Sequence, residues 1–203
     1  METVKKFSEF GEQAIIQAYF KAHPPEYKFL VDVGAYDVMK SNSAALIFLG
    51  WSGVLFEPHP LSYQNLVGYF KGWPVKIMNC AIGDGIEDAT LFVHTDLGSS
   101  SLVYEWETEQ QTGEKFTVKV YPLAPILEEL KVPKDFELLS VDAEGYDCRI
   151  MTKLLEESIY RPRMIITESP SYDNDYDLFY QHGYQLIGMT GNNLINNWFF
   201  VRG

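Results

Sequence analysis

The sequence predicts a doubly wound α/β fold, in which helices cover both faces of a mostly parallel sheet. Two observations support this prediction. Short apolar segments of strand length alternate along the chain with longer segments whose apolar residues have helical spacing. The chain then ends in two apolar segments around Gly191, which predict a closing hairpin and an antiparallel last strand.

The first half of the chain alternates between helix and strand. Residues 8–22 carry apolar side chains at helical spacing and are followed by Pro24 and Pro25, which predicts a covering helix at the N-terminus. A short apolar run, Phe29 to Val31, then leads through Asp32 and Gly34 into a polar loop, the order of a strand, a tight turn and a helix. The elements predicted next are a helix at 43–49, a strand at 53–56, a helix at about 62–70 and a strand at 75–78.

The second half contains an interruption. Residues 89–94 and 116–121 flank a polar excursion and predict an inserted antiparallel pair of strands around 89–121. The alternation then resumes with a helix at 125–130, a strand at 137–141, a helix at 149–157, a strand at 164–167, a short helix near 178–181 and the closing hairpin.

The composition is typical of one globular domain spanning residues 1–203, because 46% of the residues are hydrophobic and no linker or repeat divides them. The 16 basic and 28 acidic residues give a net charge of −12, and the bases form no stripe, so nucleic acid is not an expected partner. No segment suits a membrane span, and the two cysteines have no metal-site or disulfide spacing. We therefore expect a cytoplasmic protein without a metal or a membrane partner.

The glycine turn after the first strand predicts a cofactor site, because backbone N–H groups and the positive end of a helix meet there. A dinucleotide fold requires G-x-G-x-x-G, but the second and third glycine positions counted from Gly34 are Tyr36 and Met39. This argues against a pyrophosphate and leaves room for a phosphate-free nucleoside with an amino acid tail, such as S-adenosylmethionine. Glu57, at the end of the second strand, is placed to accept hydrogen bonds from ribose hydroxyls.

Seven blocks of residues extend this pattern over nearly the whole chain. They are FLVDVGAYD from Phe29, SNS from Ser41, LGWSGVLFEPHP from Leu49, NCAIGD from Asn79, GSSSL from Gly98, LLSVDAEGYD from Leu138 and MIITE from Met164. Together they resemble the FkbM-type, S-adenosylmethionine-dependent methyltransferases. The resemblance implies a class I methyltransferase fold, which is Rossmann-like with an antiparallel last strand, and S-adenosyl-L-methionine as the cofactor.

The resemblance also implies roles for individual residues. Asp142 and Glu144 would face the methyl group, and the residues expected around the cofactor are Asp32, Gly34, Ala35, Ser43, Glu57, Pro58, Asn79, Cys80, Ala81 and Asp142. The family loop commonly reads GANDG, whereas Tyr36 and Val38 replace its asparagine and second glycine here. We therefore expect the bulky Tyr36 to point away from the pocket or to lie along its wall.

Three residues are candidates for a catalytic base. Asp142 and Glu144 are two positions apart at a strand end and can face the same side, and His94 is the third candidate. The structural alternative is that one of the two acids caps the following helix while the other meets Arg149 or a backbone amide. Ser99 to Ser101 and the acid- and tyrosine-rich segment 171–177 are further candidates for the acceptor pocket.

The function that we expect is methyl transfer to a hydroxyl oxygen of a small molecule or saccharide. An alternative is a non-catalytic domain of the same fold that binds S-adenosylmethionine or a related nucleoside, which the changes at Tyr36 and Val38 suggest. A nicotinamide-dependent oxidoreductase is a more distant alternative, because the glycines that it requires are missing.

Overall fold

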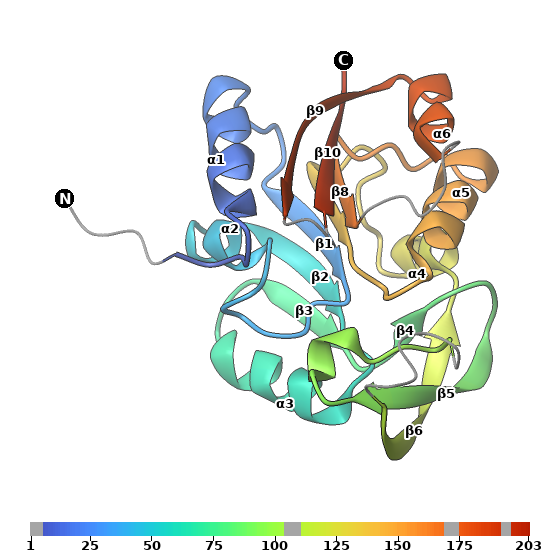
Figure 1. Ribbon diagram of the computed structural model, residues 1–203. Coiled ribbons are helices and arrows are strands. Elements are labelled where there is room, and N and C mark those ends of the chain that lie inside the picture. The colour runs from blue at the N-terminus through green and yellow to red at the C-terminus, as the bar shows by residue number, and fades with distance from the viewer. Residues whose placement is uncertain (1–5, 104–110, 169–174, 192–195) are drawn as a thin grey trace.

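The computed structural model describes residues 6–103, 111–168, 175–191 and 196–203 (Figure 1). Its centre is a seven-stranded sheet in the order β3-β2-β1-β7-β8-β10-β9. The strands are β1 (Phe29–Val33), β2 (Ser52–Phe56), β3 (Val75–Met78), β7 (Leu138–Val141), β8 (Met164–Glu168), β9 (Tyr184–Gly191) and β10 (Asn196–Arg202). β10 is antiparallel to both of its neighbours, β8 and β9, whereas β3, β2, β1, β7 and β8 are parallel to one another. The predicted fold class is therefore confirmed.

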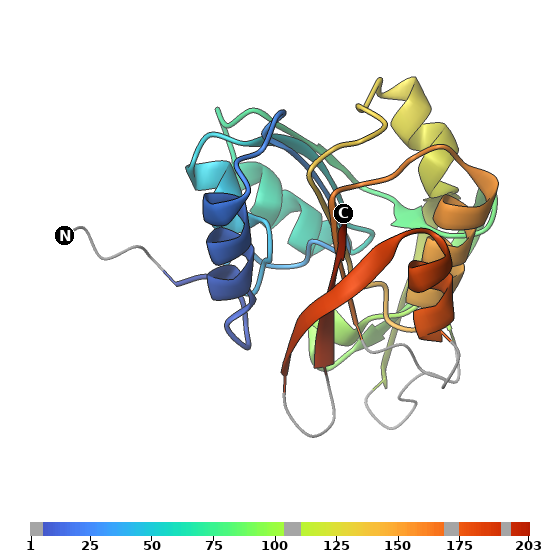
Figure 2. The same cartoon turned by 90° about the horizontal axis from the view of Figure 1, so that it is seen from above.

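Helices cover both faces of this sheet (Figure 2). One face carries α1 (Glu12–Ala22), α2 (Ala44–Phe48) and α3 (Pro60–Tyr69), and the other carries α4 (Leu123–Glu129), α5 (Asp147–Glu157) and α6 (Asp175–Gln181). A separate hydrophobic core fills the space on each side. The neighbouring strands β1 and β7 are therefore followed by helices on opposite faces, α2 and α5. Ligands bind at this position, outside the carboxyl ends of the two strands, in sheets of this type.

The strand period of two decides which residues of β1 reach which core. Leu30 packs in the core under α1 and α2, while Val31 and Val33 pack in the core under α4 and α5. Asp32 therefore shares the face of Leu30, and the register places Asp32 opposite Ser140 on β7. This alternation buries a carboxylate at the carboxyl end of the sheet.

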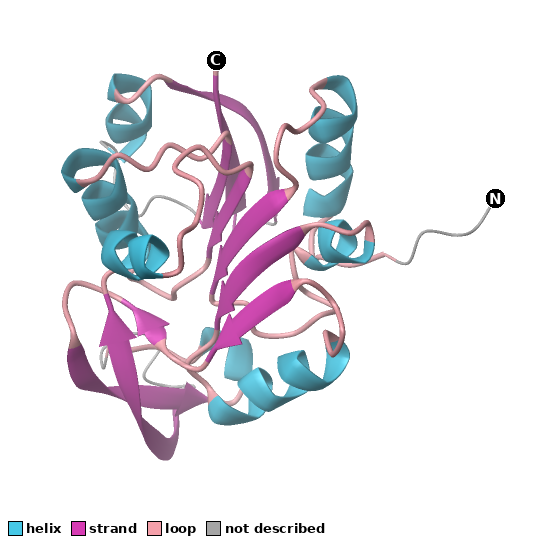
Figure 3. Cartoon of the chain, turned by 180° about the vertical axis from the view of Figure 1, so that it is seen from behind, coloured by secondary structure: helices cyan, strands magenta, loops and turns pink. Residues whose placement is uncertain are grey.

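The insertion is a second sheet that contains one strand more than predicted. It consists of β4 (Ala81–Ile82), β5 (Glu87–His94) and β6 (Gln111–Tyr121) in the order β4-β6-β5, with the short helix η1 (Leu97–Ser99) between β5 and β6. The predicted antiparallel pair is confirmed as β5 and β6, and β4 adds a parallel third strand. Two residues are too few to show an alternating pattern in the sequence. Figure 3 shows the small sheet beside the large one.

The N-terminal helix begins later than predicted. Ser8 and Gly11 have φ angles of 67° and 94°, which are left-handed and end the helical path on the N-terminal side of Glu12. The carboxylate of Glu12 instead accepts hydrogen bonds from Thr190 and Asn197, at 2.6 and 3.2 Å, and so joins this end of the chain to the closing hairpin. In the described ranges, every helix is too short or too polar to cross a membrane.

Candidate active site

The glycine turn is shaped by the close approach of two strands. Gly34 has a φ angle of 77°, and a Cβ atom at this position would overlap the backbone carbonyl oxygen of Asp142 at the end of β7. The N–H groups of Gly34 and Ala35 both donate to the carbonyl oxygen of Phe56, at 3.0 and 3.1 Å. The turn therefore uses these two amides to join β1 to β2, and they do not point to a ligand.

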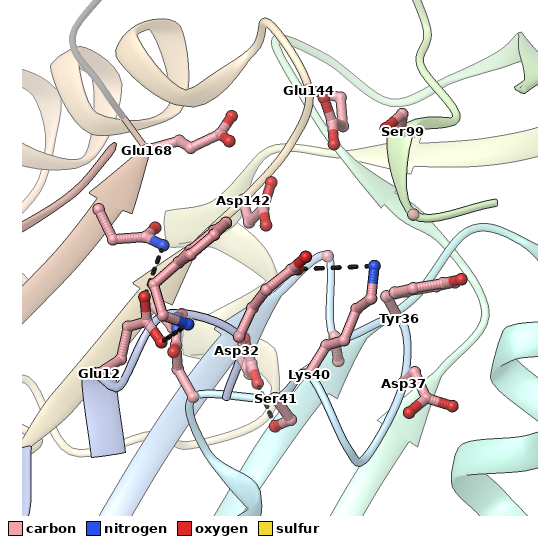
Figure 4. Close-up of a pocket in the computed structure, with 18 of the residues that line it drawn as sticks. Glu12, Asp32, Tyr36, Asp37, Lys40, Ser41, Ser99, Asp142, Glu144 and Glu168 are labelled. Carbon is pink, nitrogen blue, oxygen red and sulfur yellow. Dashed lines mark hydrogen bonds and ion pairs between the residues drawn. The ribbon is translucent and has the colours of Figure 1, made fainter. Parts of the chain in front are cut away.

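Two cavities open on either side of this turn, and we name them by their walls. The acidic cavity is drawn in Figure 4, and its charged residues are Lys40 and eight acids: Glu9, Glu12, Asp32, Asp37, Asp96, Asp142, Glu144 and Glu168. The apolar-walled cavity lies against the insertion, and its lining includes Val33, Phe56, Glu57, Pro58, His59, Cys80, Ala81, Ile82, Leu91, Leu97 and Leu102. Five residues line both cavities, namely Gly34, Tyr36, Gly98, Asp142 and Glu144.

Glu57 is a buried acid in the apolar-walled cavity. Only 4% of its surface is exposed, so it is not the solvated acid that a strand end often carries. Its Oε1 accepts a hydrogen bond from the N–H of His59 at 2.7 Å, and its Oε2 accepts one from the N–H of Tyr36 at 2.8 Å. Burial raises the pKa of Glu57 to about 7. Because a carboxylate has about four acceptor positions, the two oxygens can each accept one further hydrogen bond.

Asp32 lies at the floor of the acidic cavity. Its Oδ2 accepts a hydrogen bond from the hydroxyl of Ser41 at 3.5 Å. Burial raises the pKa of Asp32 to about 6, although the nearby hydroxyls of Ser43, Ser140 and Ser41 lower it in part. Ser43 itself is fully buried behind this acid and lines neither cavity, so it can reach a ligand only through Asp32.

Asp142 occupies the junction of the two cavities. Its Oδ1 is shielded from solvent and has no hydrogen-bond partner among the described residues. Burial is the main reason that its pKa lies well above the usual range, and the negative charges of Glu168 and Glu144 raise it further. An acid in this position holds a proton more strongly than an ordinary carboxylate, so it is suited to proton transfer.

Arg149, a partner considered for Asp142 or Glu144, pairs with a different acid. Asp147 accepts the N–H of Ala143 at 3.3 Å, at the start of α5, and Arg149 forms its ion pair with Asp84. Glu144 has a φ angle of 46°, and its carbonyl oxygen accepts a hydrogen bond from the hydroxyl of Ser101 at 2.7 Å. The turn after β7 is thus tied to the insertion, and both acids remain at the cavities.

Besides Ser43, two predicted residues are absent from the lining of both cavities. His94 is fully buried at the end of β5, within the insertion, and its ring nitrogens have no hydrogen-bond partner among the described residues. His94 is not among the residues that line either cavity, so the geometry gives no support to its predicted role as a base. The side-chain amide of Asn79 donates to the carbonyl oxygens of Glu57 and Pro58, at 2.8 and 3.0 Å, and therefore holds the loop instead of lining the cavity.

Other predicted residues line one of the two cavities. Pro58, Cys80 and Ala81 line the apolar-walled cavity, and burial raises the pKa of Cys80 to about 12, so its thiol behaves as an apolar group. Ser99 lines the acidic cavity and Ser100 the apolar-walled one. Most of the segment 171–177 lies outside the described residues.

Tyr36 forms part of the wall of both cavities. Its φ angle of 38° is left-handed, a conformation that asparagine adopts more easily. Its hydroxyl donates to Asp96 at 3.2 Å, and its ring lies so close to Gly98 that a Cβ atom there would meet it. Lys40 completes the contact with ion pairs to Asp96 at 3.4 Å and to Glu9 at 3.5 Å. Tyr36 therefore joins the glycine turn to the insertion.

Sequence reasoning missed several residues of the acidic cavity. Glu168 ends β8, the strand next to β7, and its position at a strand end was the available signal. Glu9 and Glu12 come from the N-terminal segment, and Asp96 comes from the insertion. Nothing in their spacing indicates that these segments fold over the sheet edge.

The chain matches one protein family and shares its fold with several solved structures. The model of the methyltransferase FkbM domain matches residues 32–186. A candidate methylase from Haemophilus influenzae has a similar structure, with a TM-score of 0.51 at 10% identity over 94% of this chain and 87% of its own. The precorrin-6y C5,15-methyltransferase of Geobacter metallireducens has a TM-score of 0.50 at 11% identity, over 99% and 92% of the two chains. Identities this low show a shared fold alone. No curated protein matches the sequence significantly.

Proposed function

Because the chain belongs to the FkbM methyltransferase family, we propose that it is an S-adenosylmethionine-dependent enzyme that methylates a hydroxyl oxygen of a small molecule or saccharide. The donor supplies a methyl group on a positively charged sulfur, and the acceptor oxygen displaces that sulfur in line. The observation that carries the proposal is the meeting of two unlike cavities at Asp142, one suited to a nucleoside and the other to charged or hydroxylated groups.

The residues present fit this donor. Leu91, Leu97 and Leu102 give the apolar-walled cavity the surface that a flat base requires, and Glu57 can accept hydrogen bonds from both ribose hydroxyls. Asp32, in the neighbouring cavity, suits the ammonium group of the donor's amino acid end. The amides of Gly34 and Ala35 are occupied by Phe56, which argues against a pyrophosphate and hence against a nicotinamide dinucleotide.

Asp142 is our candidate for the general base. As the new O–C bond forms and the C–S bond breaks, the electron pair of the broken bond stays on sulfur and the hydroxyl proton passes to the carboxylate. The raised pKa of Asp142 favours acceptance of this proton. Its unpartnered Oδ1, at the junction of the cavities, is the atom that we assign to this step.

The surroundings of Asp142 also bear on the kind of acceptor. The eight acids of the acidic cavity would repel a polyanion, which supports a small molecule or saccharide over nucleic acid. Carboxylates at this density bind hydroxyl and amino groups, the groups that saccharides and related small molecules present.

The test is a methyl-transfer assay in which the protein, S-adenosylmethionine and a panel of hydroxylated small molecules and saccharides are mixed, and S-adenosylhomocysteine is measured. We expect transfer to at least one acceptor, and we expect Asp142→Asn to abolish it. Asp84→Asn serves as the matched control, because Asp84 pairs with Arg149 and lines neither cavity. Binding of S-adenosylhomocysteine without transfer to any acceptor would contradict the proposal and favour the non-catalytic alternative.

A further inference from the structure

The apolar-walled cavity contains a buried imidazole whose hydrogen-bonding groups are unused. His59 lines this cavity, and only 2% of its surface is exposed. Both of its ring nitrogens are shielded from solvent and have no hydrogen-bond partner among the described residues. Most buried polar groups in proteins are paired, because burial without a partner loses the hydrogen bonds that water would make. A ligand in this cavity is the partner that remains.

Two structural roles do not account for this side chain. His59 is the N-cap residue of α3, but its side chain forms no capping hydrogen bond with the helix. Its ring packs edge-on against Phe116 of the small sheet, with 5.3 Å between the ring centroids. A phenylalanine would make the same kind of contact without burying two unpaired nitrogens. The N–H that Glu57 accepts belongs to the main chain, so it does not require a histidine either.

The imidazole of His59 is neutral at pH 7. Burial lowers its pKa from the usual 6.5, and the negative charge of Glu114 opposes this shift only in part. A neutral imidazole has one N–H donor and one acceptor nitrogen, and here no neighbour fixes which nitrogen carries the proton. A group that can both donate and accept suits the edge of a nucleobase, where donors and acceptors lie side by side.

The order of the residues along the site indicates which part of the donor lies beside His59. Asp142 lies at the junction of the cavities, where we place the methyl transfer, and Glu57 is the proposed ribose acid. His59 is two residues beyond Glu57 on the same turn and lines only the apolar-walled cavity. The three leucines that suit a flat base line this cavity as well. Because the base is attached to the ribose, it is the part of the donor that His59 can contact.

We propose that His59 recognises the base of the methyl donor: its imidazole forms a hydrogen bond with the edge of the adenine while Glu57 binds the ribose. This inference rests on the proposed function and deepens it, because it assigns recognition of the base to a residue away from the reacting atoms. His59 is accordingly a specificity-determining residue and takes no part in the transfer of the hydroxyl proton.

The direct test is NMR of the imidazole. Protein that contains isotope-labelled histidine is titrated with S-adenosylhomocysteine, and the signals of the assigned ring nitrogens are followed. In the complex we expect a single tautomer of His59, with its two nitrogen signals moved apart, because the bond to the base fixes the position of the proton. His23 stacks on Tyr19 outside both cavities, so its signals should stay unchanged and serve as the internal control.

A binding cycle locates the contact on the base. Calorimetry compares S-adenosylhomocysteine with analogues in which one ring nitrogen of adenine is replaced by a CH group, or its amino group by hydrogen. We expect at least one analogue to bind the unmodified protein about tenfold more weakly, and we expect His59→Phe to remove that difference. His59→Gln, which can still donate and accept, should keep part of it. His23→Phe is the matched control and should change none of these affinities.

Two outcomes would overturn the inference. The first is saturation with S-adenosylhomocysteine that leaves the ring-nitrogen signals of His59 unchanged. The second is a set of analogue affinities that differ from that of S-adenosylhomocysteine by the same factors in the unmodified protein and in His59→Phe, because another group would then recognise the base. If His59→Phe does not fold, the NMR titration of the unmodified protein decides the question. Failure to bind S-adenosylhomocysteine would instead overturn the proposed function, and the same titration reveals it.

Discussion

The two cavities meet at the same five residues but are made from different parts of the molecule. The apolar-walled cavity is formed by the carboxyl ends of β1 and β2 and by the small sheet packed against them. The acidic cavity is formed by the glycine turn, the ends of β7 and β8, and the irregular segment before α1. The regular fold thus supplies the surface suited to the donor, and irregular segments supply much of the surface suited to the acceptor. Substitutions in the two cavities should therefore have separable effects.

The largest expected effect follows from Asp142, which belongs to both cavities. Asp142→Asn keeps the shape of the side chain but removes the proton acceptor, so kcat/KM for methyl transfer should fall about 10²- to 10⁴-fold. The affinity for S-adenosylhomocysteine, measured by calorimetry, should stay within about threefold. Activity close to that of the unmodified protein would exclude Asp142 as the base.

The next largest effect concerns the apolar-walled cavity. Glu57→Ala should weaken the binding of S-adenosylhomocysteine by about 1.5 to 3 kcal/mol, because charge-assisted hydrogen bonds to the ribose are lost. Its removal also leaves the N–H groups of Tyr36 and His59 without their acceptor, so the stability of the variant must be measured alongside. Glu129→Ala, on the exposed side of α4, is the matched control. Unchanged affinity in a folded Glu57→Ala protein would show that another residue binds the ribose.

The pH dependence should differ in sign between ligand binding and stability. The pKa of Glu57 is raised from 4.5 to about 7, so the folded protein holds this proton to a higher pH than the unfolded chain does. The contribution of Glu57 to the free energy of unfolding therefore falls as pH rises from about 4.5 to 7. Affinity for S-adenosylhomocysteine should rise through pH 7 instead, because the ionised carboxylate accepts the ribose hydroxyls.

Thermal denaturation between pH 5 and 8, with and without S-adenosylhomocysteine, checks both signs in one experiment. In the unmodified protein, the increase in melting temperature caused by the ligand should become larger as pH rises. In Glu57→Gln, the part of this pH dependence that is centred near pH 7 should be absent. A pH-independent stabilisation would show that the protonation of Glu57 is not linked to binding.

The smallest expected effect concerns Tyr36, which joins the two cavities. Tyr36→Phe removes the hydrogen bond to Asp96, and such a bond contributes about 0.5 to 1.5 kcal/mol. We expect S-adenosylhomocysteine to dissociate a few-fold faster in stopped-flow measurements, because the insertion is held less firmly over the glycine turn. Asp96→Asn in the same background should add little if the two residues act through this contact. Fully additive effects would contradict the coupling.

The fold was predictable because its signals are local. Alternating apolar segments of the right length identified every strand of the large sheet, whereas the two residues of β4 carry no such signal. The late start of α1 depends on left-handed backbone at Ser8 and Gly11, and the sequence does not reveal that Ser8 adopts it.

The site was predictable in part. Asp32, Glu57 and Asp142, which line the cavities, were predicted because each lies near or just beyond the carboxyl end of a buried strand, and the ends of parallel strands meet at one edge of a sheet. His94 lines neither cavity, and its sequence position does not show that it is fully buried within the insertion. Glu12 was missed because its role depends on contacts with a hairpin nearly the whole chain away. Side-chain direction and long-range contacts are the information that the sequence patterns lacked.

The most direct test of the central claim is a calorimetric titration of the protein with S-adenosylhomocysteine, S-adenosylmethionine and NAD. We predict a single site for the two methionine nucleosides, with competition between them, and no heat of binding for NAD. Binding of NAD without binding of either methionine nucleoside would contradict the account, because the amides of Gly34 and Ala35 would then have to leave Phe56 to hold a pyrophosphate.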